Sequence, residues 1–154
     1  MIRYVLAVVL TIALLAISIP AIDAAATMNS ERQVDASLAA IDNKATSLIE
    51  TEEVTPDGHP DPRRVVEMTL PRDTLTTAEV DRFELVPYES GGYTHARYVL
   101  EDGTTREAVL DERIVWNDPE GNETTELGGA GEHRLALVLV ADEDGTSVIV
   151  ARRV

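Results

Sequence analysis

Apolar residues fill the chain from Tyr4 to Ile22, interrupted only by Thr11, Ser18 and Pro20. About 19 residues at 1.5 Å per residue give roughly 28 Å of helix, close to the thickness of a bilayer's hydrocarbon core. The pattern therefore predicts a transmembrane anchor over residues 1–23.

Beyond this run the apolar residues recur every three or four positions instead of filling every position. They form one stripe, with polar and charged residues on the other faces: Val34, Leu38, Ile41, Ala45 and Leu48. Such spacing is typical of an amphipathic helix that packs through one side. It predicts a helical stalk over residues 24–53, so that a single helix of some 45 residues runs from about Ile2 to Glu50.

Pro20 lies inside this predicted helix. It has no N–H and cannot donate a hydrogen bond to the carbonyl of Ala16, so we expect a kink there, eased if Ser18 supplies a local hydrogen bond. In a second interpretation, Pro20 marks the end of the membrane helix.

The same N-terminal segment also fits a cleaved signal peptide. Arg3 gives it a short basic start, and Ala24-Ala25-Ala26 satisfies the small-x-small cleavage rule, so the mature chain would begin at Thr27. However, the apolar run is longer than the usual 7 to 15 residues of a signal peptide, and the helical pattern continues past the cleavage site. Both interpretations stay open.

Residues 54–64 contain Pro56, Gly58, Pro60 and Pro62, which predict a stiff, Pro-rich linker without helix. From residue 65 to 154 the pattern changes to alternation and to β-branched residues, which predicts a β head domain. The candidate strands are VVEMTL, RFELVPY, YTHARYVLE, TTREAVL, RIVW, HRLALVLVA and TSVIVARR. Only TTAEV, near Thr76, suggests a helical turn.

Three turn signals connect neighbouring strands as hairpins: residues 89–92, Asp102-Gly103 and Asp144-Gly145. A two-residue turn at Asp144-Gly145 would place Leu139 opposite Val150. Both faces of this hairpin are apolar, so we expect it to be central and covered on both sides. The fold class that follows is α+β: a long N-terminal helix and a small antiparallel β-sandwich or sheet, with Phe83 and Trp116 as core residues.

The amino-acid composition excludes some classes of binding partner and of chemical site. The chain has 28 acidic and 13 basic residues and a formal charge of -15, so its surface repels nucleic acid, and we expect no nucleic-acid partner. Lys44 is the only lysine. This acidic, lysine-poor composition is typical of halophilic proteins, and we expect folding to require high salt. Without cysteine, disulfides, thiolate metal sites and cysteine nucleophiles are excluded.

Motifs for catalysis or cofactor binding are scarce. The chain lacks a glycine-rich phosphate loop, an HExxH pattern and a GxSxG nucleophile elbow, and the three histidines are far apart in sequence: His59, His95 and His133. We therefore expect no enzyme activity, no catalytic residues, no cofactor and no metal site.

The segment NDPEGNET has two motifs of its own. Asp118, Glu120 and Asn122 alternate as in the first half of a calcium loop, but the second half is missing. Asn122 also begins an Asn-Glu-Thr acceptor triplet for N-glycosylation. We keep Asn122 as a candidate glycosylation site.

The phrase LLAISIPAIDAAA resembles the N-terminal helix of type IV pilins and their archaeal relatives. The resemblance implies an apolar segment that continues into an amphipathic half packed on a β-rich head. Pilins carry a basic leader and a glutamate at the fifth mature position, whereas here Arg3 falls roughly at that position and no processing motif precedes it. Either the start codon is misplaced, or this is an unprocessed, pilin-like accessory protein.

Arg3 precedes the apolar run and Asp23 follows it, so the positive-inside rule places the N-terminus in the cytoplasm and the head outside the cell. We expect a membrane-anchored, pilin-like structural or accessory component, with membrane lipid and pilin-like proteins or a second copy as partners. Small residues at Ala7, Ala13, Ala16 and Ser18 permit close helix packing in lipid. The alternative is an exported β-sandwich binding module of the cell surface.

Overall fold

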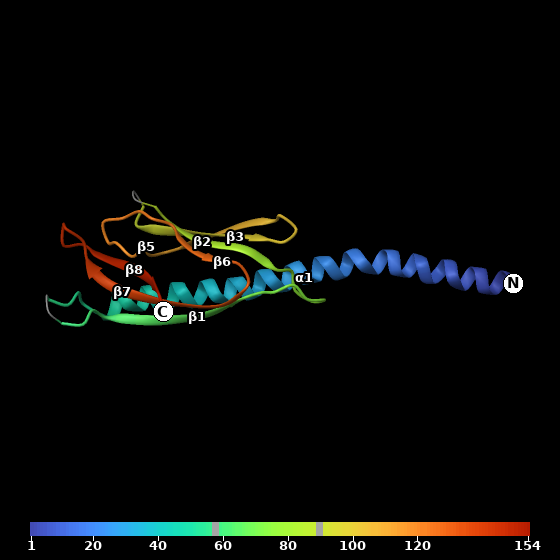
Figure 1. Cartoon of the computed structure of the whole chain (residues 1–154), viewed down its shortest axis with the longest axis horizontal. Helices are drawn as coiled ribbons and strands as arrows, with labels where there is room; N and C mark the ends of the chain where they lie inside the picture. Colours follow the sequence, from blue (N-terminus) through green and yellow to red (C-terminus); the bar gives the residue numbers. More distant parts are fainter. Residues whose placement is uncertain (57–58, 89–90) are drawn as a thin grey trace.

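One long helix begins the chain and reaches into a β head (Figure 1). The computed structural model describes residues 1–56, 59–88 and 91–154. Helix α1 (Ile2–Thr51) contains no glycine and one proline, Pro20, so little in its sequence opposes helix over 50 residues. It ends where the backbone of Glu52 becomes extended, shortly before Pro56.

Eight strands follow in the described residues: β1 (Arg63–Leu70), β2 (Val80–Tyr88), β3 (Tyr93–Leu100), β4 (Thr105–Leu110), β5 (Ile114–Trp116), β6 (Thr125–Gly128), β7 (Gly131–Ala141) and β8 (Ser147–Arg153). The seven predicted strands are all present, and β6 is the one that the sequence analysis missed. Its four residues are too few to show a clear alternation.

The strands form two four-stranded sheets, in the orders β1-β7-β8-β5 and β4-β3-β2-β6. The α+β fold class is confirmed, with one correction to the antiparallel head: β5 pairs with β8 in parallel. The chain reaches β5 from the other sheet, after β4, and this connection lets β5 enter beside β8 in the same direction.

The β7–β8 hairpin is central in its sheet, but its register differs by one residue from the prediction. Leu139 pairs with Ile149 rather than with Val150. The loop has three residues between Asp142 and Thr146, because the Asp142 N–H bonds the Thr146 carbonyl at 2.9 Å and Gly145 adopts a φ of 78°. The hairpin therefore has a three-residue loop with glycine in the left-handed region, which is one residue longer than the two-residue turn that we expected.

Both faces of this hairpin are nevertheless buried, as predicted. Leu137 and Leu139 point into the main core, whereas Val148 and Val150 form a second small cluster with Val115 of β5. Glycines at two predicted turns, Gly103 and Gly145, have positive φ. The third predicted turn includes Glu89 and Ser90, which lie outside the described residues.

The main core lies where α1 meets both sheets (Figure 1). Phe83 of β2 and Leu135 of β7 are fully buried there, together with apolar residues of the helix. The helix lies against β1 and β4, the edge strand of each sheet on the same side. It therefore acts as a third wall of the sandwich.

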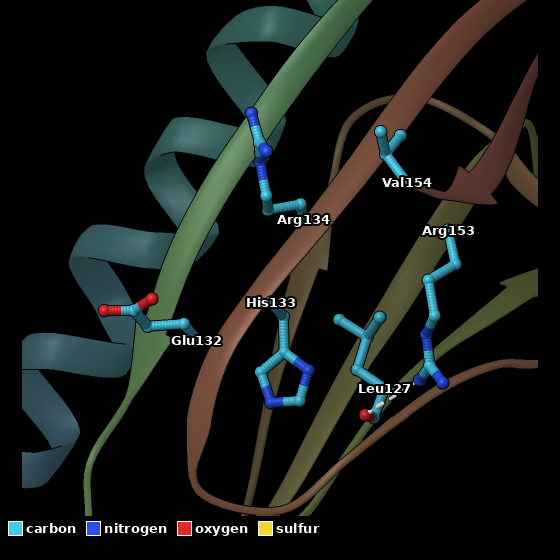
Figure 2. Close-up of a pocket in the computed structure, with 6 residues that line it drawn as sticks. All are labelled: Leu127, Glu132, His133, Arg134, Arg153 and Val154. Atoms are coloured by element: carbon cyan, nitrogen blue, oxygen red, sulfur yellow. Dashed lines mark hydrogen bonds between the residues drawn. The ribbon is translucent and has the colours of Figure 1, made fainter.

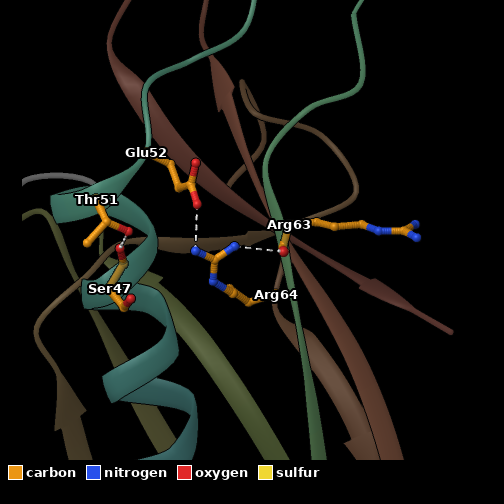
Figure 3. A network of polar contacts seen from close by, with 5 residues as sticks. All are labelled: Ser47, Thr51, Glu52, Arg63 and Arg64. Atoms are coloured by element: carbon orange, nitrogen blue, oxygen red, sulfur yellow. Dashed lines mark hydrogen bonds and ion pairs between the residues drawn. The ribbon is translucent and has the colours of Figure 1, made fainter.

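The connection from helix to sheet spans residues 52–62, since α1 ends at Thr51 and β1 begins at Arg63. It is held at both ends. The Pro62 carbonyl accepts a hydrogen bond from the Leu139 N–H at 2.9 Å. Arg64 donates to Glu52 at 2.6 Å, and within the last helical turn Thr51 donates to the Ser47 carbonyl (Figure 3).

Candidate functional site: the free half of the N-terminal helix

Burial divides α1 into two halves. Residues 1–25 are all exposed, and the first buried residue is Ala26. We call residues 2–25 the free half and residues 26–51 the packed half. The free half contains the chain's candidate membrane span, which by length and composition is sufficient to cross a bilayer. At 1.5 Å per residue the free half is about 36 Å long, against about 30 Å of hydrocarbon.

Hydroxyl groups in the free half are satisfied within the helix. Thr11 donates to the Ala7 carbonyl at 2.9 Å, and Ser18 donates to the Leu14 carbonyl at 2.7 Å. Between Tyr4 and Ile22 the sequence has no charged residue. Polar groups that are bonded inside the helix can enter hydrocarbon without an unsatisfied donor. Residues 4–22 of the free half are therefore chemically compatible with lipid on all of their faces.

Pro20 lies within α1 and does not end it. The Ser18 hydroxyl bonds the carbonyl of Leu14, not that of Ala16, which is the carbonyl that loses its donor to proline. In Figure 1 the helix stays continuous and bends gently. Pro20 therefore does not separate the two halves.

The packed half carries the predicted stripe into the core. Its five residues are each at most 4% exposed: Val34, Leu38, Ile41, Ala45 and Leu48. The sequence analysis missed the N-terminal extension of this stripe, formed by Ala26 and Ser30 at the same four-residue spacing. Ser30 is fully buried and donates to the Ala78 carbonyl at 2.7 Å. The four-residue spacing of Ser30 from Val34 could have indicated that it is buried, but a polar side chain is not expected in an apolar stripe.

Polar contacts attach the packed half to both sheets. Lys44 donates to the Val65 carbonyl in β1, and Asp42 accepts from the Asp111 N–H, just after β4, at 3.0 Å. Glu31 pairs with Arg106 of β4 at 2.8 Å. The helix therefore bridges the two edge strands.

Tyr98 is the titratable group most affected by this packing. It lies on β3 and is 3% exposed. Burial raises the pKa of Tyr98 to about 12, and the carboxylates of Asp35 and Glu31 on the helix add to the effect. The neutral phenol is thus the form that the folded head holds at neutral pH.

The histidines occupy different parts of the molecule. His59 is an exposed residue of the connection, His95 is on β3 and His133 is on β7 in the other sheet. His95 contacts the rings of Tyr88 and Tyr93, with centroids 6.2 and 5.3 Å away. Across the described residues, no three His, Cys, Asp or Glu side chains are grouped to hold a metal ion.

His133 lines a surface pocket of about 410 Å³ with Leu127, Glu132, Arg134, Arg153 and Val154 (Figure 2). Three of its polar side chains have partners within the protein. A ring nitrogen of His133 lies 2.8 Å from the Gly129 carbonyl, Arg153 donates to the Leu127 carbonyl, and Arg134 pairs with Glu67.

The acidic loop between β5 and β6 uses its carboxylates within the protein. Asp118 accepts from the Glu120 N–H at 3.0 Å, and Glu120 accepts from the Glu143 N–H in the β7–β8 loop. The second of these bonds joins the β5–β6 loop to the β7–β8 loop, so two carboxylates of the partial calcium-loop pattern have partners within the protein. Asn122 is exposed in the same loop, where an acceptor side chain is accessible.

The chain belongs to a family described as a domain of unknown function, DUF7311, whose model matches residues 1–154. No curated protein and no solved structure matches the chain. The family description names no activity.

Proposed function

We propose that this protein is a membrane-anchored, pilin-like component of a surface or secretion assembly, with a structural or accessory rather than catalytic role. One observation carries the proposal. A single continuous helix has a wholly exposed apolar half and a half that is built into the core of a β head. A soluble protein has no use for some 36 Å of exposed apolar helix, whereas a bilayer removes this surface from water.

Charge supports an orientation with the head outside the cell. Arg3 precedes the candidate span and Asp23 follows it, and basic residues favour the cytoplasmic side. In this orientation Asn122 is on the side where N-glycosylation of surface proteins occurs, and its exposed loop would accept a glycan. The acidic head then faces the external medium.

Small residues support lateral association of the free half in the membrane. At about 100° per residue, Ala7 and Ser18 lie on one side of the helix, roughly opposite to Val34 of the packed stripe. Ala13 and Ala16 lie nearer to the side of that stripe. Because Ala7 and Ser18 turn away from the head, two free halves can approach there without a clash between heads.

The test uses protein from native membranes. Intact mass and N-terminal sequencing would define the start of the chain, and disulfide crosslinking of single-cysteine variants would map neighbours, since the natural chain has no cysteine. We expect a membrane-bound chain that keeps the free half. We also expect Ala7→Cys and Ser18→Cys to crosslink more strongly than the control Ala13→Cys. Uniformly weak crosslinking at all three positions would contradict lateral association.

One observation favours the alternative, an exported binding module. The candidate cleavage site Ala24-Ala25-Ala26 coincides with the boundary between the free and packed halves, so cleavage would remove the exposed helix and leave the core stripe intact. The same mass measurement separates the two functions. A soluble protein that starts at Thr27 would establish the exported module and end the anchor proposal.

A further inference from the structure

The connection between β1 and β2, residues 71–79, is a tight loop with an apolar tip. The Thr74 N–H bonds the Thr77 carbonyl at 2.9 Å, and Thr77 donates its hydroxyl to the Arg72 carbonyl at 2.8 Å. The helical turn predicted near Thr76 is absent, since Thr74 and Thr77 form an isolated β-bridge instead. Leu75 is at the tip, and it is 88% exposed.

This loop is fixed against the N-terminal end of the packed half. Asn29 donates to the Thr76 carbonyl at 3.0 Å, and Ser30 donates to the Ala78 carbonyl at 2.7 Å. Figure 1 shows the β1–β2 connection, in green, extending beyond the sheets along α1 toward the N-terminus. The tip therefore points toward the candidate membrane span and cannot swing freely.

The position of the tip matches the depth of the lipid headgroups. Asn29 lies six residues beyond Asp23, the first charged residue after the apolar run, which is about 9 Å along the helix. The headgroup layer extends about 5 to 7 Å outside the hydrocarbon core. A leucine that projects from the level of Asn29 toward the span reaches this layer. Met28, 53% exposed on the helix, is close to the same level.

We propose that Leu75 inserts into the headgroup layer of the bilayer and gives the head a second contact with lipid. This inference rests on the proposed membrane anchoring. With one contact through α1 and another through the loop, the head is held at one tilt and one rotation relative to the membrane plane. An apolar side chain at a membrane interface gains from partial burial even when it is a single residue.

Lipid fits the tip better than a protein partner does. A stable protein interface buries about 800 Å² on each side, whereas Leu75 stands among polar neighbours, with threonines beside it and Arg72 and Asp73 before it. The other large hydrophobic residues that are exposed on the described part of the head are scattered: Tyr88, Val109 and Val154. A bilayer needs no surrounding patch, because it takes up each apolar side chain that reaches it.

The experiment measures the depth of single residues in phosphatidylcholine vesicles. Full-length single-cysteine variants carry an NBD fluorophore, and lipids with nitroxides in the headgroup or in the acyl chain quench it according to depth. We expect headgroup nitroxide to quench Leu75→Cys at least about twofold more than the control Glu143→Cys at the distal loop. Leu10→Cys, in the free half, should be quenched by acyl-chain nitroxide.

A second control separates insertion of Leu75 from attraction of the fluorophore to lipid. Thr104→Cys lies at the end of the turn between β3 and β4, where the Thr104 carbonyl accepts a hydrogen bond from the Leu100 N–H. It carries the same label. If Leu75→Cys is quenched no more than Thr104→Cys or Glu143→Cys while Leu10→Cys is quenched, the inference is wrong and the anchor stands. If Leu10→Cys is not quenched, the proposed function itself is wrong.

Discussion

The two halves of α1 share one backbone geometry and differ in the number of apolar faces. The free half is apolar on every side, and it is exposed over residues 1–25. The packed half is apolar on one stripe, and the head buries that stripe. The packed half shows that a single apolar stripe indicates burial against a protein core, whereas apolar residues on every face are typical of a helix that lies in lipid. Because no loop separates the halves, the candidate membrane span and the helix of the core are one continuous element.

Deletion of residues 1–25 should separate the halves most completely. None of these residues is buried, so the shortened chain should keep its fold and move entirely from the membrane to the soluble fraction. Ultracentrifugation of cell lysates and circular dichroism would follow location and fold. A shortened chain that is unfolded would show that the fold of the head depends on the free half, and the two halves would then not be independent.

The same substitution in each half gives the next largest contrast. Ile41→Ala removes a fully buried side chain and should lower the free energy of unfolding of the head by about 2 to 5 kcal/mol. Ile12→Ala, in the exposed free half, should change it by less than about 0.5 kcal/mol. Denaturant titration in detergent compares the two variants. Equal losses would mean that the halves are not energetically distinct.

Salt should act on the head and not on the span. The acidic surface repels itself in dilute buffer, and the Debye length falls to about 3 Å at 1 M salt, so the melting temperature of the head should rise with potassium chloride. Attachment to membranes, measured by alkaline extraction, should not change, because no charge lies between Tyr4 and Ile22. A fully native circular dichroism spectrum in dilute buffer would contradict a need for salt.

High pH should weaken the contact between the head and the packed half. Tyr98 has a pKa of about 12 in the folded head, against an ordinary value of 10.0. Above pH 10 the unfolded chain loses the proton first, so stability should fall as pH rises from 10 toward 12. Below pH 10 this contribution is constant. Thermal melts should show a smaller loss over this range for Tyr98→Phe, and identical profiles would exclude Tyr98 as the cause.

Much of the fold could be predicted because its signals are local. The stripe from Val34 to Leu48 and the alternation in the strands depend on spacing alone, and both indicate buried faces. The β7–β8 register was harder to predict, because the turn begins at Asp142 and not at Asp144. One additional residue in the loop shifts every cross-strand pair of the hairpin. The parallel entry of β5 beside β8 depends on the path of the chain between sheets, which local patterns do not describe.

The candidate site likewise has features that the sequence predicts and features that require the tertiary structure. The apolar span could be recognised from composition, but the role of Ser30 could not, because its partner Ala78 is 48 residues away. Leu75 directly precedes the segment TTAEV, which suggested a helical turn. Its exposure follows from the Thr74–Thr77 bridge and from the attachment of the loop to Asn29, both of which require the tertiary structure.

The position of the helix between β1 and β4 also bears on aggregation. An uncovered edge strand presents free N–H and carbonyl groups to which a strand of another molecule can add. Here the helix lies along one edge strand of each sheet and bonds backbone groups there, at Val65 and Asp111. A head that lost the packed half would open two sheet edges at once. The half of the helix that carries the apolar stripe is therefore also what keeps these two sheet edges from pairing with a strand of another molecule.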